Sequence, residues 1–306
     1  MGWNRHWLGI LSVVALAACD EIDRDPVPTW GPWDQVTGEF HAELEQAPVA
    51  SVAESVLRVV SYNVYRGVDV DADAAYFVSD PDLSGADIIA IQEATRPDRD
   101  GALSDVAQLA AALHMGYVFV PTFEYKGNVH GIGLLSRYPM FDVEVMLLPV
   151  TAELTVKAQA ARAALHATIL TADGPVHIIN VHLDPPLNVP ERILQLRPAV
   201  LDAPAPTAVL GDFNTNDYVW AGNTIPDLPL DAVADTSQAD ALDGYMEGIG
   251  YDTPTSELGS TWNGILEDQR LDSVFTQGLV SGAGAVEREL RTSDHWPLWI
   301  DLRVRR

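Results

Sequence analysis

Val209–Asn214 reads VLGDFN, a short apolar run that ends in an aspartate and an asparagine two positions apart. We predict a buried strand over residues 208–213, because a continuous apolar run that ends in polar groups is typical of strands covered on both faces. Side chains alternate between the faces of a strand, so Asp212 and Asn214 are expected to point the same way. Catalytic and ligand groups of layered α/β proteins often gather at such strand ends.

Other predicted strands also end in polar side chains. They are found in SYN at 61–63, IQE at 91–93, INVHL at 179–183, RLDSVF at 270–275 and SDH at 293–295. Any one of these polar residues is more simply a turn former or a satisfied buried group. Six such strand ends in one chain instead favour a shared functional site.

The apolar patterns predict many strands with few helices between them. Strands are expected at 57–64, 87–92, 117–121, 131–136, 143–148, 162–170, 176–183, 208–213, 270–275, 285–290 and 298–304. Apolar residues at helical spacing predict helices over 102–114 and 190–201, the second with Pro190 in its first turn. No βαβ unit of fixed length repeats, so we predict a mixed α/β layered fold that forms a single domain over residues 56–306.

These motifs together resemble the endonuclease/exonuclease/phosphatase superfamily, the DNase I-like proteins. The resemblance rests on YN at 62–63, QE at 92–93, LLSRYP at 134–139, NVHL at 180–183, GDFN at 211–214, LD at 271–272 and SDH at 293–295. It covers about residues 57–304. It implies a four-layer α/β/β/α sandwich of two packed mixed sheets, and a Mg²⁺-dependent phosphoesterase.

The resemblance also implies a metal site. Glu93 matches the family's metal-binding glutamate, Asn63 matches the asparagine beside it, and Asp294 is expected to complete the set directly or through water. Mg²⁺ takes one or two carboxylates, with water and substrate oxygens filling the remaining positions. Mn²⁺ is the alternative cation.

The remaining matches imply acid–base catalysis. His295 matches the catalytic histidine and Asp272 the aspartate that orients it, while Asp212 and Asn214 match the pair that positions and deprotonates the attacking water. The choice of general base between Asp212 and His295 stays open here. His182 matches a histidine that contacts the phosphate or the leaving oxygen.

Two further residues are predicted to contact the substrate phosphate. They are Arg162, which matches the family loosely, and Asn180, which is expected on the same strand face as His182. Arg66 and His130 are weaker candidates, for which a surface or packing role is the simpler interpretation. The aromatic residues of the stretch 215–262 are interpreted as core residues within family-variable substrate loops.

The composition argues against a protein that is held on duplex nucleic acid by a broad basic face. Lys+Arg is 18 and Asp+Glu is 44, which gives a formal net charge of −26, and only Lys126 and Lys157 are lysines. Neutralising many phosphates needs Lys and Arg. A small cationic pocket, or a phosphate bridged by a metal, is not excluded by this charge.

The N-terminus predicts export with a lipid anchor. The apolar run from Leu8 to Ala18 is too short for the roughly 20 residues of a membrane-spanning helix, and it reads as a signal peptide. LAAC at 16–19 resembles the lipobox of bacterial lipoproteins, which implies cleavage after residue 18 and lipidation of Cys19, the only cysteine. Residues 19–55, acidic and rich in Pro and Trp, are expected to tether the domain to the membrane on the periplasmic or cell-surface side.

The substrate class stays open at this point. A nucleic acid, a phospholipid head group or a small phosphoester is expected, whereas inositol phosphates are disfavoured because QRLD at 269–272 departs from the pattern of the 5-phosphatases. A non-catalytic binding module on the same fold is the alternative to an enzyme. We expect a monomer.

Overall fold

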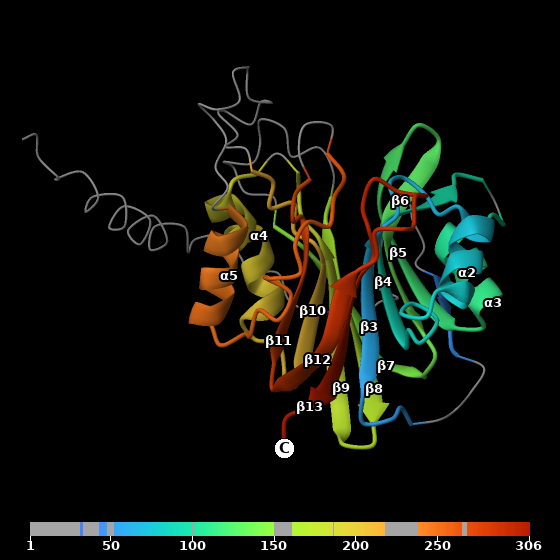
Figure 1. Cartoon of the computed structure of the whole chain (residues 1–306). Coiled ribbons are helices and arrows are strands. Elements are labelled where there is room, and N and C mark those ends of the chain that lie inside the picture. The colour runs from blue at the N-terminus through green and yellow to red at the C-terminus, as the bar shows by residue number, and fades with distance from the viewer. Residues whose placement is uncertain are drawn as a thin grey trace, which may run out of the picture.

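Two β-sheets lie face to face in the computed structural model, which describes residues 31–32, 43–47, 52–99, 101–149, 161–185, 187–217, 238–264 and 268–306 (Figure 1). The first sheet contains, in spatial order, β12 (Leu279–Val286), β13 (Leu298–Val304), β3 (Leu57–Asn63), β4 (Ile88–Pro97), β6 (Asn128–Ser136), β5 (Gly116–Tyr125) and β2 (Glu43–Glu45). The second contains β1 (Gly31–Pro32), β7 (Met140–Leu147), β8 (Ala163–Thr171), β9 (Gly174–His182), β10 (Thr207–Asp212) and β11 (Asp272–Gln277). The predicted signal peptide and Cys19 lie outside the described residues.

Helices cover the outer face of each sheet. α2 (Val70–Ser79) and α3 (Asp105–Leu113) pack on the first sheet through a core that includes Phe77 and Leu109. α4 (Val189–Val200) and α5 (Gln238–Gly248) pack on the second through a core that includes Leu196 and Met246. A third apolar core fills the space between the sheets. The fold is therefore the predicted α/β/β/α sandwich (Figure 1).

Both sheets are mixed, and their parallel pairs position the site. β3 runs parallel to β4, with Asn63 opposite Gln92, and β9 runs parallel to β10, with His182 opposite Asp212. β11 starts where β10 ends, because Asp272 pairs with Asp212 in an antiparallel ladder. The polar ends of five strands therefore meet at one end of the sandwich.

A buried polar bridge joins the two sheets below this end. Asn180 of β9 donates from Nδ2 to the carbonyl oxygens of Ile91 (2.9 Å) and Gly133 (2.8 Å) in the first sheet. Its Oδ1 accepts from Gln92 Nε2 at 2.8 Å, and both side chains are fully buried. A buried amide is tolerated only when its donors and acceptors are paired, so this bridge specifies how the sheets stack.

Most predicted elements are confirmed, within a few residues at their ends. The predicted strand over 285–290 is wrong, because β12 lies at Leu279–Val286, where small and glycine residues hide the apolar pattern. α2 and α5 were not predicted. α2 buries only Phe77 and Asp73, and α5 contains Gly244 and falls in the stretch interpreted as loops.

Parts of the predicted tether belong to the sheets. Gly31–Pro32 pairs with β7 and Glu43–Glu45 pairs with β5, and Ala53 forms a bridge to Thr171. These pieces are too short to show a period of two in the sequence. Among the residues that the structure describes, no helix combines the length and apolar character needed to cross a bilayer.

Candidate active site

Glu93 reaches the site through an irregularity in β4. Asn63 and Gln92 lie on the inner face of the first sheet, so regular alternation would turn Glu93 to the outer face. The register of β4 against β6 shifts between Ile91 and Ala94, and Glu93 has a φ of 60°. This bulge brings the half-buried Glu93 carboxylate to the Asn63 amide, with Asn63 Nδ2 3.4 Å from Glu93 Oε1. Bulges of this kind often re-aim a side chain beside an active site.

Asn63 joins Glu93 to the second sheet. Its Nδ2 also donates to Asp212 Oδ2 at 2.8 Å, while its Oδ1 accepts from the backbone N–H of Tyr65 at 3.0 Å. The same nitrogen therefore contacts carboxylate oxygens of both Glu93 and Asp212. Residues that are 149 positions apart in the chain meet at this amide.

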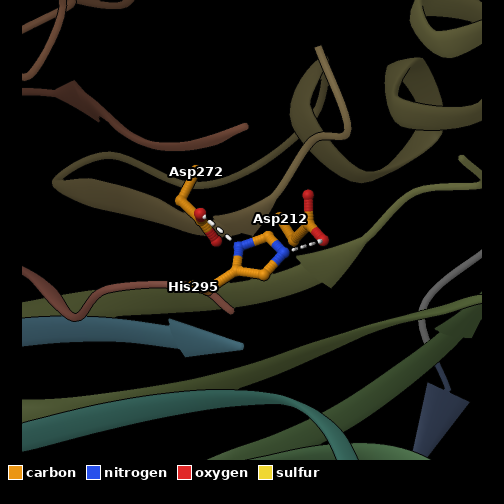
Figure 2. Close-up of side chains that lie close together, drawn as sticks. All are labelled: Asp212, Asp272 and His295. Atoms are coloured by element: carbon orange, nitrogen blue, oxygen red, sulfur yellow. Dashed lines mark hydrogen bonds and ion pairs between the residues drawn. The ribbon is translucent and has the colours of Figure 1, made fainter. Parts of the chain in front are cut away.

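His295 lies between two aspartates (Figure 2). Its Nδ1 is 2.7 Å from Asp272 Oδ2, and its Nε2 is 3.9 Å from Asp212 Oδ2. Burial lowers the pKa of His295, but the charge and the hydrogen bond of Asp272, together with Asp212, outweigh it and raise the pKa to about 10. The imidazole is therefore protonated at neutral pH, and its Nε2–H faces Asp212.

Asp212 is the centre of the cluster. Its Oδ1 accepts from the backbone N–H of Asn214 at 2.8 Å, and its Oδ2 accepts from Asn63. Burial raises the pKa of Asp212 to about 7, although the charge of His295 opposes the shift. A carboxyl group that titrates near neutral pH is suited to accept a proton from water.

The backbone geometry of the GDFN turn explains the residues at both of its ends. A Cβ on Gly211, whose φ is 150°, would lie 2.0 Å from the carbonyl oxygen of Val181. Asn214 has a φ of 52°, and its Nδ2 donates to the carbonyl oxygen of Leu183 at 2.9 Å. Asn214 thus holds the turn that orients Asp212, with its backbone rather than its side chain touching the carboxylate.

His182 is held in one tautomer by an arginine. Arg162 Nη1 lies 2.9 Å from His182 Nδ1, and because guanidinium only donates, Nδ1 must accept and Nε2 carries the proton. Burial, reinforced by Arg162 and His295, holds the pKa of His182 well below its ordinary value. His182 Nε2 is buried without a hydrogen-bond partner among the described atoms, 3.5 Å from Asp212 Oδ2. His182 is therefore a neutral donor aimed at the cluster.

Two residues that the sequence did not single out hold Arg162. Arg162 Nε donates to Asp184 Oδ1 at 2.7 Å, and Gln195 Nε2 of α4 donates to Asp184 Oδ2 at 3.0 Å. Asp184 follows the NVHL motif closely, but nothing in the sequence pairs it with Gln195. Arg162 thus contacts the ring nitrogen of His182 that does not face Asp212. The predicted contact of Arg162 with the substrate phosphate stays a prediction.

Asp294 is fixed by a tryptophan. Trp262 Nε1 donates to Asp294 Oδ2 at 3.1 Å, and Ser293 Oγ donates to the carbonyl oxygen of Asn63 at 2.7 Å. The half-buried Asp294 therefore sits on a loop tied to β3. The interpretation of Trp262 as a plain core residue misses this hydrogen bond, which joins residues too distant in the chain for a pattern to link them.

Asn180 does not join the site. Both protons of its amide nitrogen and its oxygen are bonded across the sheets, and it is fully buried. These bonds give Asn180 a role between the sheets and leave its amide no free donor proton, and its predicted contact with a substrate phosphate stays a prediction.

Within the described part of the chain, one group of three metal-suited side chains has ligand atoms within 4.8 Å of one another, namely Asp212, Asp272 and His295. His295 Nδ1 is already bonded to Asp272, so this trio is better understood as a hydrogen-bonded acid–base unit. The predicted metal ligands adjoin this trio: Asn63 donates to Asp212, and the charge of Asp294 acts on His295. Asn63 is buried, whereas Glu93 and Asp294 are half-buried.

The chain is similar to known proteins throughout this region. A model of the Endonuclease/Exonuclease/phosphatase family matches residues 60–295. A search of curated protein sequences gave no match.

Solved structures with the same fold share little sequence with it. An endonuclease/exonuclease/phosphatase from Beutenbergia cavernae is 22% identical, with a TM-score of 0.62 over 82% of the present chain and 72% of the other. A family protein from Leptotrichia buccalis is 14% identical, with a TM-score of 0.61 over 81% and 99%. TDP2 of D. rerio, complexed with a single-strand DNA product, is 18% identical, with a TM-score of 0.53 over 82% and 100%. At these identities the structures establish the fold. The match over residues 60–295 shows that the chain belongs to the endonuclease/exonuclease/phosphatase family, whose members hydrolyse phosphoric ester bonds with divalent metal ions.

Proposed function

We propose that this chain cleaves a phosphodiester or phosphomonoester by in-line attack of a water molecule that Asp212 deprotonates. The observation that carries the proposal is the placement of Asp212, whose Oδ2 lies 3.9 Å from His295 Nε2 and 3.5 Å from His182 Nε2. Phosphoryl transfer needs an oriented nucleophile and neutralisation of charge on the phosphate oxygens. This cluster supplies a base and two N–H donors for that purpose.

The pKa values divide the roles of Asp212 and His295. With a pKa of about 10, His295 is protonated at neutral pH and cannot accept the proton of water. Burial raises the pKa of Asp212 to about 7, so its carboxylate is a stronger base than an ordinary aspartate and can accept it. We therefore assign the general base to Asp212 and a charged donor to His295, which Asp272 holds in place.

His182 donates to a phosphate or leaving oxygen in this scheme. Its Nε2–H is fixed by the Arg162 contact at Nδ1 and forms no hydrogen bond with a described residue, although Asp212 Oδ2 lies 3.5 Å away. A buried donor without a partner costs stability unless a ligand oxygen pairs with it. His182 therefore stabilises developing negative charge without itself changing protonation.

The donor set fits a hard divalent cation. Glu93 and Asp212 both accept from the Asn63 amide, and Asp294 lies close enough to His295 to raise its pKa. Three carboxylates therefore converge around Asn63 and His295. We propose that Glu93, Asn63 and Asp294 hold Mg²⁺, with Mn²⁺ as a substitute. When bound, the cation supplies charge neutralisation at the phosphate. Asn63 Oδ1 accepts one backbone hydrogen bond and keeps a second lone pair for this purpose.

Hydrolysis of bis-p-nitrophenyl phosphate tests the proposal. We expect turnover with Mg²⁺, loss of turnover in EDTA, and a drop of about 10²–10⁴-fold in the His295→Ala variant. EDTA-resistant turnover, or full activity of the variant, would contradict it. The filled catalytic positions argue against a binding module, which would show no turnover under any of these conditions.

We also propose that the chain is exported and anchored by lipid at Cys19, on the periplasmic or cell-surface side. The signal-like run and LAAC at 16–19 support this. A Cys19→Ser variant should leave the membrane fraction, and its continued sedimentation with membranes would refute the anchor.

A further inference from the structure

Asp105, the first residue of α3, carries a carboxylate that joins two other segments of the chain. Its Oδ2 accepts from the backbone N–H of Val68 at 2.9 Å. The same oxygen accepts from Thr95 twice, from the backbone N–H at 2.8 Å and from the hydroxyl at 3.0 Å. α3 lies on the outer face of the first sheet (Figure 1), so Asp105 reaches these segments from the helical layer.

Both segments follow a predicted metal ligand. Thr95 comes two positions after Glu93, and Val68 comes five positions after Asn63. One carboxylate oxygen therefore holds the chain just beyond each of these two ligands.

The turn after Asn63 is held at both of its ends. Residues 65–67 have φ values of 46°, 66° and 128°, all in the left-handed region. Asn63 Oδ1 fixes the start by accepting a backbone N–H at 3.0 Å, and Asp105 fixes the end through the N–H of Val68. A Cβ on Gly67 would lie 3.4 Å from Asp105 Oδ2, so the turn packs directly on this carboxylate. Left-handed geometry is costly for residues other than glycine and persists where the surroundings enforce it.

The bulge that aims Glu93 is held on its far side by the same carboxylate. Glu93 has a φ of 60°, and regular pairing of β4 with β6 resumes at Ala94. Thr95 is the next residue, and its two hydrogen bonds to Asp105 fix the place where the strand resumes. Because a bulge directs its side chains through the backbone on either side, this anchor also fixes the direction of Glu93.

Capping of α3 does not account for a carboxylate at this position. Ser104 already caps the helix, since its Oγ accepts from the backbone N–H of Ala107 at 3.1 Å. Asp105 is only 6% exposed, and burial raises its pKa to about 6 although its hydrogen bonds oppose the shift. A buried carboxylate is costly in its charged form. Groups that are retained against such a cost are often found where function requires them.

We propose that Asp105 is a positioning residue for the divalent cation, one that holds Glu93 and the turn after Asn63 in the geometry that binds the ion without touching the ion itself. The inference rests on the metal site and the phosphoesterase function proposed above. Partners that orient metal ligands commonly contribute about 10–100-fold to metal affinity. A purely structural role would instead lower the stability of the fold and leave the affinity of the folded protein for the ion unchanged.

Binding of Mn²⁺ to the purified full chain, measured by EPR of the free ion, tests this role without any turnover. Glu93→Gln is the reference for ions held by the acidic surface, because the chain has a formal charge of −26. We expect Asp105→Ala to weaken the Kd of the Glu93-dependent site by about tenfold or more. Asp105→Asn keeps one acceptor oxygen and Thr95→Val keeps its backbone N–H, so each should weaken the Kd by a smaller factor. These two variants decide the question if Asp105→Ala does not fold.

Two matched controls should bind Mn²⁺ as the wild type does. Ser104→Ala removes the cap at the same end of α3. Asp87→Asn removes a carboxylate at the opposite end of β4, where Asp87 accepts the backbone N–H of Arg58 at 2.9 Å and burial likewise raises its pKa.

A wild-type Kd in the Asp105 and Thr95 variants would overturn the proposal. Equal weakening by Ser104→Ala would also overturn it, because the effect would then come from general loosening of the helix. Hydrolysis of bis-p-nitrophenyl phosphate separates this failure from failure of the enzyme proposal. Metal-dependent turnover by the wild type, with unchanged Mn²⁺ binding in the Asp105 variants, would refute only the positioning role. Weakened Mn²⁺ binding in those variants, without any turnover by the wild type, would refute only the phosphoesterase.

Discussion

Asn180 offers a sharp test of the difference between a residue that builds the site and one that touches substrate. An Asn180→Leu change keeps the approximate size of the side chain but removes its hydrogen bonds. It leaves the carbonyl oxygens of Ile91 and Gly133 and the amide of Gln92 without this partner in a fully buried place. Each orphaned buried group costs about 1–3 kcal/mol. Burial of the apolar leucine offsets part of that cost, so we expect a loss of about 3 kcal/mol.

Urea unfolding measures this loss directly. Stability should fall by that amount with an unchanged m-value, which is a large part of the ~5–15 kcal/mol typical of a folded domain. A Gln92→Leu/Asn180→Leu double variant should lose less than the two single variants together, because the first change already breaks their shared bond. If Asn180→Leu unfolded within about 0.5 kcal/mol of the wild type but raised KM strongly, Asn180 would be a substrate contact and the bridge would be refuted.

Further predictions concern the acid–base cluster and the rest of the fold. Asp272→Asn should lower kcat/KM for bis-p-nitrophenyl phosphate by about 10²–10⁴-fold, because His295 loses the partner that keeps it charged; retained activity would contradict the pairing. Arg162→Met should remove the donor that fixes the tautomer of His182, so kcat/KM should fall while burial keeps the pKa of His182 low, and an unchanged kcat/KM would contradict the tautomer. Burial lowers the pKa of His166 to about 4, below the ordinary value near 6.5, so the stability tied to its neutral form is complete above pH 6.5 and is lost as pH falls towards 4. Relative to His166→Gln, the wild type should lose up to about 3 kcal/mol between pH 7 and 4 in urea unfolding, and parallel pH curves would contradict this. Gly211→Ala should destabilise the protein and lower its activity, and a neutral result in both assays would show that the turn can relax.

Local patterns predicted the framework because burial dictates them. The strands that end at Asn63, His182 and Asp212 are mostly apolar, and strands of this kind are typically covered on both faces wherever they lie. Their shared polar ends therefore indicated one site before any contact was known. The helix α5 was missed because its apolar residues are few and sit within a polar stretch that includes Gly244.

The contacts that finish the site depend on distant parts of the chain. Strand alternation alone would direct Glu93 away from Asn63, and only the bulge in β4 reverses this. The tautomer of His182 depends on Arg162, which is held by Asp184 and Gln195 from outside any motif. Such relations follow from the packing of the two sheets, which no periodicity encodes.

The central claim is that Glu93 and Asp212 serve one metal-dependent hydrolytic site in different roles. Titration of bis-p-nitrophenyl phosphate hydrolysis with Mg²⁺ tests it most directly. We predict that Glu93→Gln will need at least about tenfold more Mg²⁺ for half-maximal rate, while Asp212→Asn will lower kcat by about 10²-fold or more. Hydrolysis that is independent of Mg²⁺ in the wild type, or wild-type titration curves in both variants, would contradict the account.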